Sequence, residues 1–127
     1  MRGAVAGTGR TLAMFPRGRV IDGLYGRLAG RARGHCECGC LKPIPPAHAD
    51  HFFGRRKAEE SEATVWLLHV DCDFAKTRNH PSSTAWLARF AAHCDRYGYA
   101  ESATRARARI DFVDTRRMLG SALGTRR

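Results

Sequence analysis

Two short stretches hold four of the five cysteines of this 127-residue chain, His35-Cys36-Glu37-Cys38-Gly39-Cys40 and Leu68-His69-Val70-Asp71-Cys72-Asp73. Cysteines two residues apart make poor disulfide partners, whereas mixed Cys and His clusters are typical of zinc sites. A structural zinc ion takes four ligands in a tetrahedron. We therefore expect the fold to bring the two stretches together around one zinc ion.

The second stretch supplies an H-x-x-C pair, His69 and Cys72. The spacing of the first stretch permits three pairs: Cys36/Cys38, His35/Cys38 or Cys38/Cys40. Gly39 would allow the turn after the cysteine to fold its amides toward a thiolate. We select one set of zinc ligands: Cys36, Cys38, His69 and Cys72. Because a module of about 45 residues can barely bury a core, zinc contributing on the order of 10 kcal/mol would be its main stabilising element.

The residues between the two clusters predict a β-hairpin. Side chains alternate in polarity from Ala47 to Phe53, a charged loop occupies residues 54–63, and the apolar run 64–68 is the returning strand. A helix is expected from Asp73 to about Asn79. The predicted fold class is α+β, a hairpin followed by a helix with zinc clamping the two ends.

The flanking regions predict helices. Residues 1–14 are rich in Gly and Arg and are expected to form a flexible basic arm, and 15–34 a short helical segment. One helical face in that segment would carry Ile21, Leu24, Tyr25 and Leu28. Residues 81–127 begin with a capping serine, Ser82 or Ser83, and an amphipathic helix that ends at Gly98. Its apolar stripe consists of Trp86, Leu87, Phe90, Ala91, Cys94 and Tyr97.

One or two more helical segments would complete the basic C-terminal region. Cys94 lies on the apolar stripe and is interpreted as a buried apolar residue, not a ligand. His48 and His93 are assigned ordinary structural roles.

The charge of the chain is strongly positive, with 22 Lys and Arg against 12 Asp and Glu, a formal net charge of +10. Residues 1–34 hold seven arginines and one acid, and residues 81–127 hold nine arginines and four acids. Residues 35–80 hold six basic and seven acidic residues. This division favours a polyanionic partner, most often a nucleic acid, gripped by the flanks.

Membrane insertion and secretion are not expected. No stretch approaches the ~18 uninterrupted apolar residues of a transmembrane helix, and the first ten residues contain no apolar run typical of a signal peptide. We expect a protein of the cytoplasm.

The order of these residues resembles the HNH endonuclease family, the nucleases with a ββα-metal or His-Me finger core. The family pattern is a Cys pair with Gly, an Asp-His dipeptide opening a hairpin, an Asn before the second strand, and L-C-x-x-C-H-x-x-K-T on a helix. Here it appears as Cys36-x-Cys38-Gly39, Asp50-His51 and Leu68-His69-x-x-Cys72-Asp73-x-x-Lys76-Thr77. The resemblance covers residues 35–80 and defines the HNH-like module of the predicted domain organisation.

Three positions depart from the family pattern. His69 replaces the first Cys of the second pair, Thr64 stands near the position of the Asn, and Asp73 replaces the last His or Asn. Asp73 is an oxygen ligand of the kind that Mg²⁺ or Mn²⁺ prefers. His80 follows two helical turns later and could share its face.

The resemblance implies a metal-dependent endonuclease that hydrolyses DNA phosphodiester bonds. Asp50 and Asp73 would bind one catalytic Mg²⁺ or Mn²⁺, and His51 would be the general base. Phosphate contacts would come from Arg55, Arg56, Lys76 and Arg78. The implied cofactors are structural zinc and this divalent ion, with no small-molecule cofactor. The protein would act in the cytoplasm of a bacterial or phage-infected cell and would be encoded by a phage or mobile element.

Two other functions fit the same sequence. The first is a non-catalytic zinc-stapled DNA-binding module, which would bind DNA with a steep salt dependence and cleave nothing. The second is a structural or assembly protein that uses zinc only to hold its fold.

Overall fold

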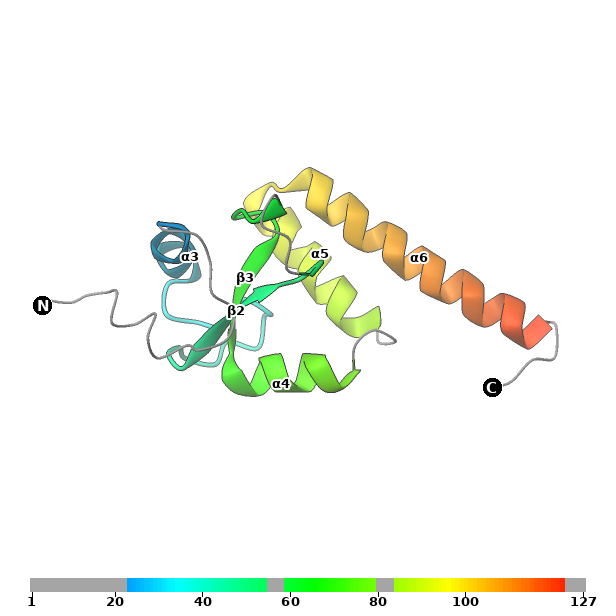
Figure 1. The fold of residues 1–127 in the computed structure, drawn as a ribbon, viewed down its shortest axis with the longest axis horizontal. Coiled ribbons are helices and arrows are strands. Elements are labelled where there is room, and N and C mark those ends of the chain that lie inside the picture. The colour runs from blue at the N-terminus through cyan, green and yellow to red at the C-terminus, as the bar shows by residue number, and fades with distance from the viewer. Residues whose placement is uncertain (1–22, 55–58, 80–83, 123–127) are drawn as a thin grey trace, which may run out of the picture. The chain divides into compact units, whose positions relative to one another are not determined.

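The computed structural model describes residues 23–54, 59–79 and 84–122. Within them the chain is α+β, with one two-stranded antiparallel sheet and four helices (Figure 1). The elements in chain order are α3 (Leu24–Ala32), β2 (Ala47–His51), β3 (Val65–His69), α4 (Val70–Asn79), α5 (Thr84–Tyr97) and α6 (Ala100–Ala122). They divide into two compact units between Arg78 and Asn79. None of the helices in these ranges is both long and apolar enough to cross a bilayer.

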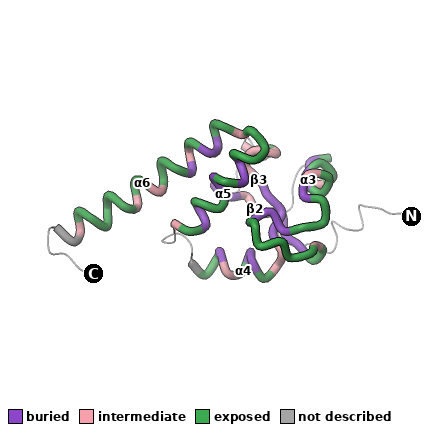
Figure 2. Tube along the Cα trace, turned by 180° about the vertical axis from the view of Figure 1, so that it is seen from behind, coloured by how far each residue is buried: buried purple, intermediate pink, exposed green. Residues whose placement is uncertain are grey.

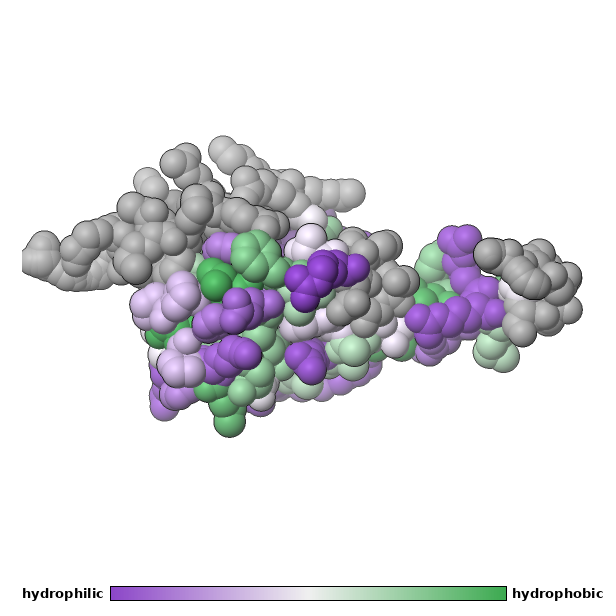
Figure 3. Space-filling model, turned by 90° about the horizontal axis from the view of Figure 1, so that it is seen from below, coloured by the Kyte–Doolittle hydropathy of each residue, from purple (hydrophilic) through white to green (hydrophobic). Residues whose placement is uncertain are grey.

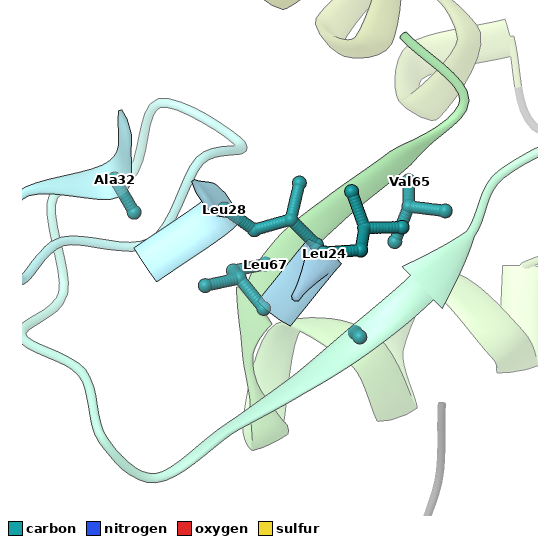
Figure 4. Close-up of a cluster of buried hydrophobic side chains, with 6 residues drawn as sticks. Leu24, Leu28, Ala32, Val65 and Leu67 are labelled. Carbon is teal, nitrogen blue, oxygen red and sulfur yellow. The ribbon is translucent and has the colours of Figure 1, made fainter. Parts of the chain in front are cut away.

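Helix α3 covers one face of the hairpin. Its buried side chains repeat every four residues at Leu24, Leu28 and Ala32, and so line one side of the helix. They form a cluster with Ala49 of β2 and with Val65 and Leu67 of β3. Figure 4 labels all of these side chains except Ala49. The helical face predicted from the sequence is therefore confirmed at Leu24 and Leu28, and Ile21 lies outside the described residues.

The register of the hairpin decides which side chains share a face. Ala49 pairs with Leu67 and Asp50 with Trp66. Because side chains alternate along a strand, Ala49 and Leu67 face α3 while Asp50 and Trp66 face the opposite side. The strands differ from the prediction only at their ends, since β2 stops at His51 and β3 starts and ends one residue later.

Helix α4 follows β3 without a connecting loop and starts at Val70, three residues earlier than the sequence indicates. Asp71 and Asp73 lie in its first turn, where negative charge stabilises the positive end of the helix dipole. Figure 3 looks from below Figure 1, where α4 lies, and the surface on that side mixes hydrophilic and hydrophobic side chains.

The second unit is a helical hairpin. The stripe predicted for α5 is buried from Trp86 to Cys94, although Tyr97 at its end is exposed. Gly98 follows with a φ of 80°, which ends the helix at the predicted residue. The rest is one helix of 23 residues, α6, whose buried residues lie near its start at Ser102, Ala103 and Ala106. Figure 2 shows that most of its C-terminal half is exposed.

Candidate functional site

The first cysteine stretch forms a tight loop between α3 and β2. The Cys36 amide donates a hydrogen bond to the Lys42 carbonyl at 2.8 Å, and His35 bridges to Pro43 at the base of the loop. Gly39 has a φ of 97°, a backbone conformation that side chains disfavour. The loop therefore turns back on itself, as the glycine predicts, and gathers its cysteines at one end.

Four thiols meet where this loop contacts the start of α4. The Sγ atom of Cys38 lies 3.4 Å from that of Cys36 and 3.8 Å from that of Cys72, and Cys40 lies 3.5 Å from Cys72. All four sulfur atoms lie within 4.8 Å of one another. A tetrahedral zinc site with Zn–S bonds of about 2.3 Å separates its sulfur atoms by about 3.8 Å. The four cysteines could therefore hold a metal ion such as zinc.

The protonation of the thiols agrees with a site built for a cation. The hydrogen bond from the Cys36 thiol lowers the pKa of Cys38 to about 5, and the same hydrogen bond raises the pKa of Cys36. Burial raises the pKa of Cys72 to about 12. The raised pKa values of Cys36 and Cys72 favour their protonated forms, and a bound metal would displace those protons.

The fourth sulfur comes from Cys40, whereas the sequence favours His69. The His69 ring accepts a hydrogen bond at Nδ1 from the Asp71 amide at 3.0 Å, while its own amide donates to Cys36 Sγ at 3.2 Å. His69 therefore contributes a backbone donor to the cluster. His35, another candidate, places Nδ1 3.1 Å from the Arg33 carbonyl.

A buried ion pair ties the cysteine loop to α3 and β3. Arg31 of α3 donates two hydrogen bonds of 2.7 Å to the carboxylate of Glu37, which lies between two of the cysteines. Both side chains are buried, and Glu37 also accepts a bond from the Leu67 amide at 2.9 Å. Sequence reasoning missed this pair, because nothing in the local pattern of either residue indicates a partner on another element.

The two carboxylates predicted to bind a divalent ion lie on the α4 side of the hairpin. Trp66 Nε1 donates to Asp50 Oδ2 at 2.8 Å, and Lys76 Nζ lies 3.4 Å from Asp50 Oδ1. His48 Nδ1 donates to Asp73 Oδ2 at 2.7 Å, with both side chains buried. Each carboxylate is therefore already held by donors from the protein.

Burial raises the pKa of Asp50, and the nearby Asp73 charge raises it further, while Lys76 and the Trp66 indole lower it. Oxygen ligands on one side of the hairpin suit Mg²⁺ or Mn²⁺, and a divalent ion at Asp50 would replace the Lys76 ammonium. Across residues 23–54, 59–79 and 84–122, the thiols are the only group of three or more potential ligands close enough to share an ion.

His51, the predicted general base, follows Asp50 and therefore points to the other face of β2. Its Nε2 atom lies 2.5 Å from Glu60 Oε2, and both side chains are buried. Thr64, near the position of the family's Asn, organises the loop before β3, since its hydroxyl donates to the Glu59 carbonyl at 2.5 Å.

The predicted phosphate contacts have different surroundings. Lys76 is buried, with its ammonium at Asp50 and 5.5 Å from the centre of the Phe52 ring. Arg78 is exposed at the end of α4. Arg55, Arg56 and His80 lie outside the described residues. The buried positions of His48, His93 and Cys94 agree with the structural roles assigned to them.

Comparison of the chain with protein-family models, curated proteins and solved structures finds no match. The thiol cluster can hold a soft metal ion, and the carboxylate pair has donor atoms for a hard one.

Proposed function

We propose that this chain is a metal-dependent DNA endonuclease of the HNH type, with β2, β3 and α4 as its ββα-metal core. One observation carries the proposal: Asp50 of the Asp-His dipeptide and Asp73 of the helix are both held on the same side of the hairpin. Asp73 follows Cys72 directly, so the zinc ligand fixes the helix turn that presents the carboxylate.

The residues divide the reaction among them. Asp50 and Asp73 would hold one Mg²⁺ or Mn²⁺, and the chemistry supplied by that ion is neutralisation of charge on the phosphate and the leaving 3′ oxygen. His51 would take a proton from the attacking water, because the pKa of imidazole lies near the working pH. In-line attack requires the water that His51 activates and the ion at Asp50 to lie on opposite sides of the phosphorus.

DNA is the proposed partner. The net charge of +10 supports this choice, as do exposed arginines at the end of α4 and along α6. At the end of α4 and along α6, these exposed arginines are Arg78, Arg107, Arg109, Arg116 and Arg117. We place the protein in the cytoplasm of a bacterial or phage-infected cell, where reduced thiols and DNA occur together.

The test is cleavage of supercoiled plasmid by the zinc-loaded full chain with Mg²⁺ or Mn²⁺. Wild type is expected to nick or linearise the plasmid, and His51→Ala is expected to lose this activity while keeping its zinc content and its thermal unfolding temperature. Equal degradation of the plasmid by both proteins would contradict the proposal.

The second candidate is a non-catalytic zinc-stapled DNA-binding module. The position of Lys76 favours it, because an ammonium already neutralises Asp50 where the divalent ion would bind. This candidate predicts salt-dependent DNA binding, with log K falling steeply with log salt, and no cleavage with any divalent ion.

A further inference from the structure

The loop before β3 contains three glutamates, and one of them differs from its neighbours. Glu62 lies at the surface with its side chain 40% exposed and pairs with Arg27. The Glu60 side chain is only 4% exposed and meets His51, whose side chain is 7% exposed, at 2.5 Å. A carboxylate buried this deeply needs a specific partner, and here the partner is the proposed general base.

The chemistry of the pair fixes the imidazole proton. An ionised carboxylate only accepts hydrogen bonds, so an ionised Glu60 requires the proton of the contact to be on the Nε2 atom of His51. In the neutral ring the other nitrogen, Nδ1, then has a free lone pair. This is the tautomer that a general base needs.

Backbone contacts hold the two partners in place. The Phe52 amide donates to the Thr64 carbonyl at 3.1 Å, which closes the loop that contains Glu60. The Ser61 amide donates to the Thr64 hydroxyl at 3.1 Å, and the Gly54 amide donates to the His51 carbonyl at 3.0 Å. These bonds fix the backbone next to both partners of the contact.

We propose that Glu60 is a positioning residue that orients His51 and fixes its tautomer for proton abstraction, an inference that rests on the proposed nuclease function. In the step itself a water O–H bond breaks and its proton passes to Nδ1. The water oxygen forms a bond to phosphorus, and the bond to the 3′ oxygen breaks with its electron pair on that oxygen, which then takes a proton from solvent. Glu60 stabilises the imidazolium that forms, as a buried acid does in a catalytic triad.

The matched pair of variants is Glu60→Gln and Glu62→Gln, which remove the same charge from one loop. With the zinc-loaded full chain and Mn²⁺, we expect Glu60→Gln to lower the rate of plasmid cleavage by about 10²–10⁴-fold with an unchanged Kd for DNA. Glu62→Gln should stay within about twofold of wild type, since exposed charges contribute little.

Nitrogen-15 NMR of His51 provides a readout that a purely structural role would not move. The wild-type ring should be the Nε2–H tautomer, and Glu60→Gln should give a mixture at unchanged zinc content. Cleavage by Glu60→Gln at the wild-type rate, while His51→Ala is inactive, overturns this inference alone. Cleavage that survives in His51→Ala overturns the proposed function and the inference together.

Discussion

Two neighbouring residues at the start of α4, Cys72 and Asp73, belong to groups of opposite character. Cys72 joins three other thiols, with sulfur atoms 3.4 to 3.8 Å apart along the measured contacts. Asp73 accepts a hydrogen bond from His48, and its companion Asp50 is held by Trp66 and Lys76. The thiols face one another, whereas the carboxylates face donors from the protein.

The difference indicates which proposed ion would be needed for folding and which for chemistry. Thiols grouped at these distances, three of them buried, gain little from one another, and a bound cation would make the arrangement favourable. Carboxylates that are already hydrogen-bonded can stay in place without an ion. We therefore expect zinc to be structural and the divalent ion at Asp50 and Asp73 to exchange freely.

Removal of zinc should have the largest effect. A structural zinc ion contributes on the order of 10 kcal/mol, more than a unit of this size can replace by packing. A strong chelator is expected to unfold the hairpin and α4, and added zinc should refold them. Circular dichroism and thermal melting measure both changes. Unchanged melting after complete zinc removal would contradict a structural role.

Breaking the buried ion pair should have the next largest effect. Arg31→Met leaves the Glu37 charge buried without its partner, which typically costs about 3–5 kcal/mol. Denaturant unfolding of the zinc-loaded protein measures this loss. The exposed pair offers the control, because Arg27→Met should cost less than about 1 kcal/mol. Equal losses in both variants would show that Glu37 does not depend on Arg31.

The fourth zinc ligand can be identified by comparing the zinc affinity of two variants, with a smaller expected effect. Cys40→Ser removes a cluster thiol and should weaken zinc binding by more than the roughly 10–100-fold typical of changes outside the ligand set. His69→Ala keeps its amide bond to Cys36 and should retain zinc. Competition with a chromogenic chelator compares the two variants, and loss of zinc from His69→Ala alone would restore the ligand set expected from sequence.

Replacement of Lys76 should have the smallest effect, and the opposite sign. Lys76→Met removes the ammonium that neutralises Asp50, so Mn²⁺ should bind roughly tenfold more tightly, about 1.4 kcal/mol. Calorimetric titration of the zinc-loaded variant measures this change, with Arg78→Met as a control for loss of positive charge from the same helix. Weaker Mn²⁺ binding would mean that Lys76 does not compete with the ion.

The sequence predicted the parts of the fold that depend on local periodicity. The buried face of α3, the pairing of β2 with β3 and the stripe of α5 follow from the spacing of residues such as Leu28, Ala49 and Phe90. The start of α4 was missed because no turn residue separates it from β3. Local spacing also does not distinguish one long α6 from two shorter helices.

The sequence predicted which types of residue form the candidate site, but it predicted less well which side chains contact one another. The spacing of the cysteines located the metal cluster, but the choice between Cys40 and His69 depends on how the loop folds back. The contacts of Glu37 with Arg31 and of Glu60 with His51 join separate segments, so no sequence period reveals them.

We propose that cleavage depends on a carboxylate-bound ion distinct from zinc. The most direct test is plasmid cleavage by wild type, Asp50→Asn and Asp71→Asn. Each protein is loaded with zinc, freed of other divalent ions and then titrated with Mn²⁺. Asp50→Asn retains an acceptor for Trp66, and Asp71 is an exposed acid in the same unit. We expect cleavage only with Mn²⁺, at least about 100-fold slower in Asp50→Asn and unchanged in Asp71→Asn. Cleavage without added Mn²⁺, or at the wild-type rate in Asp50→Asn, would contradict it.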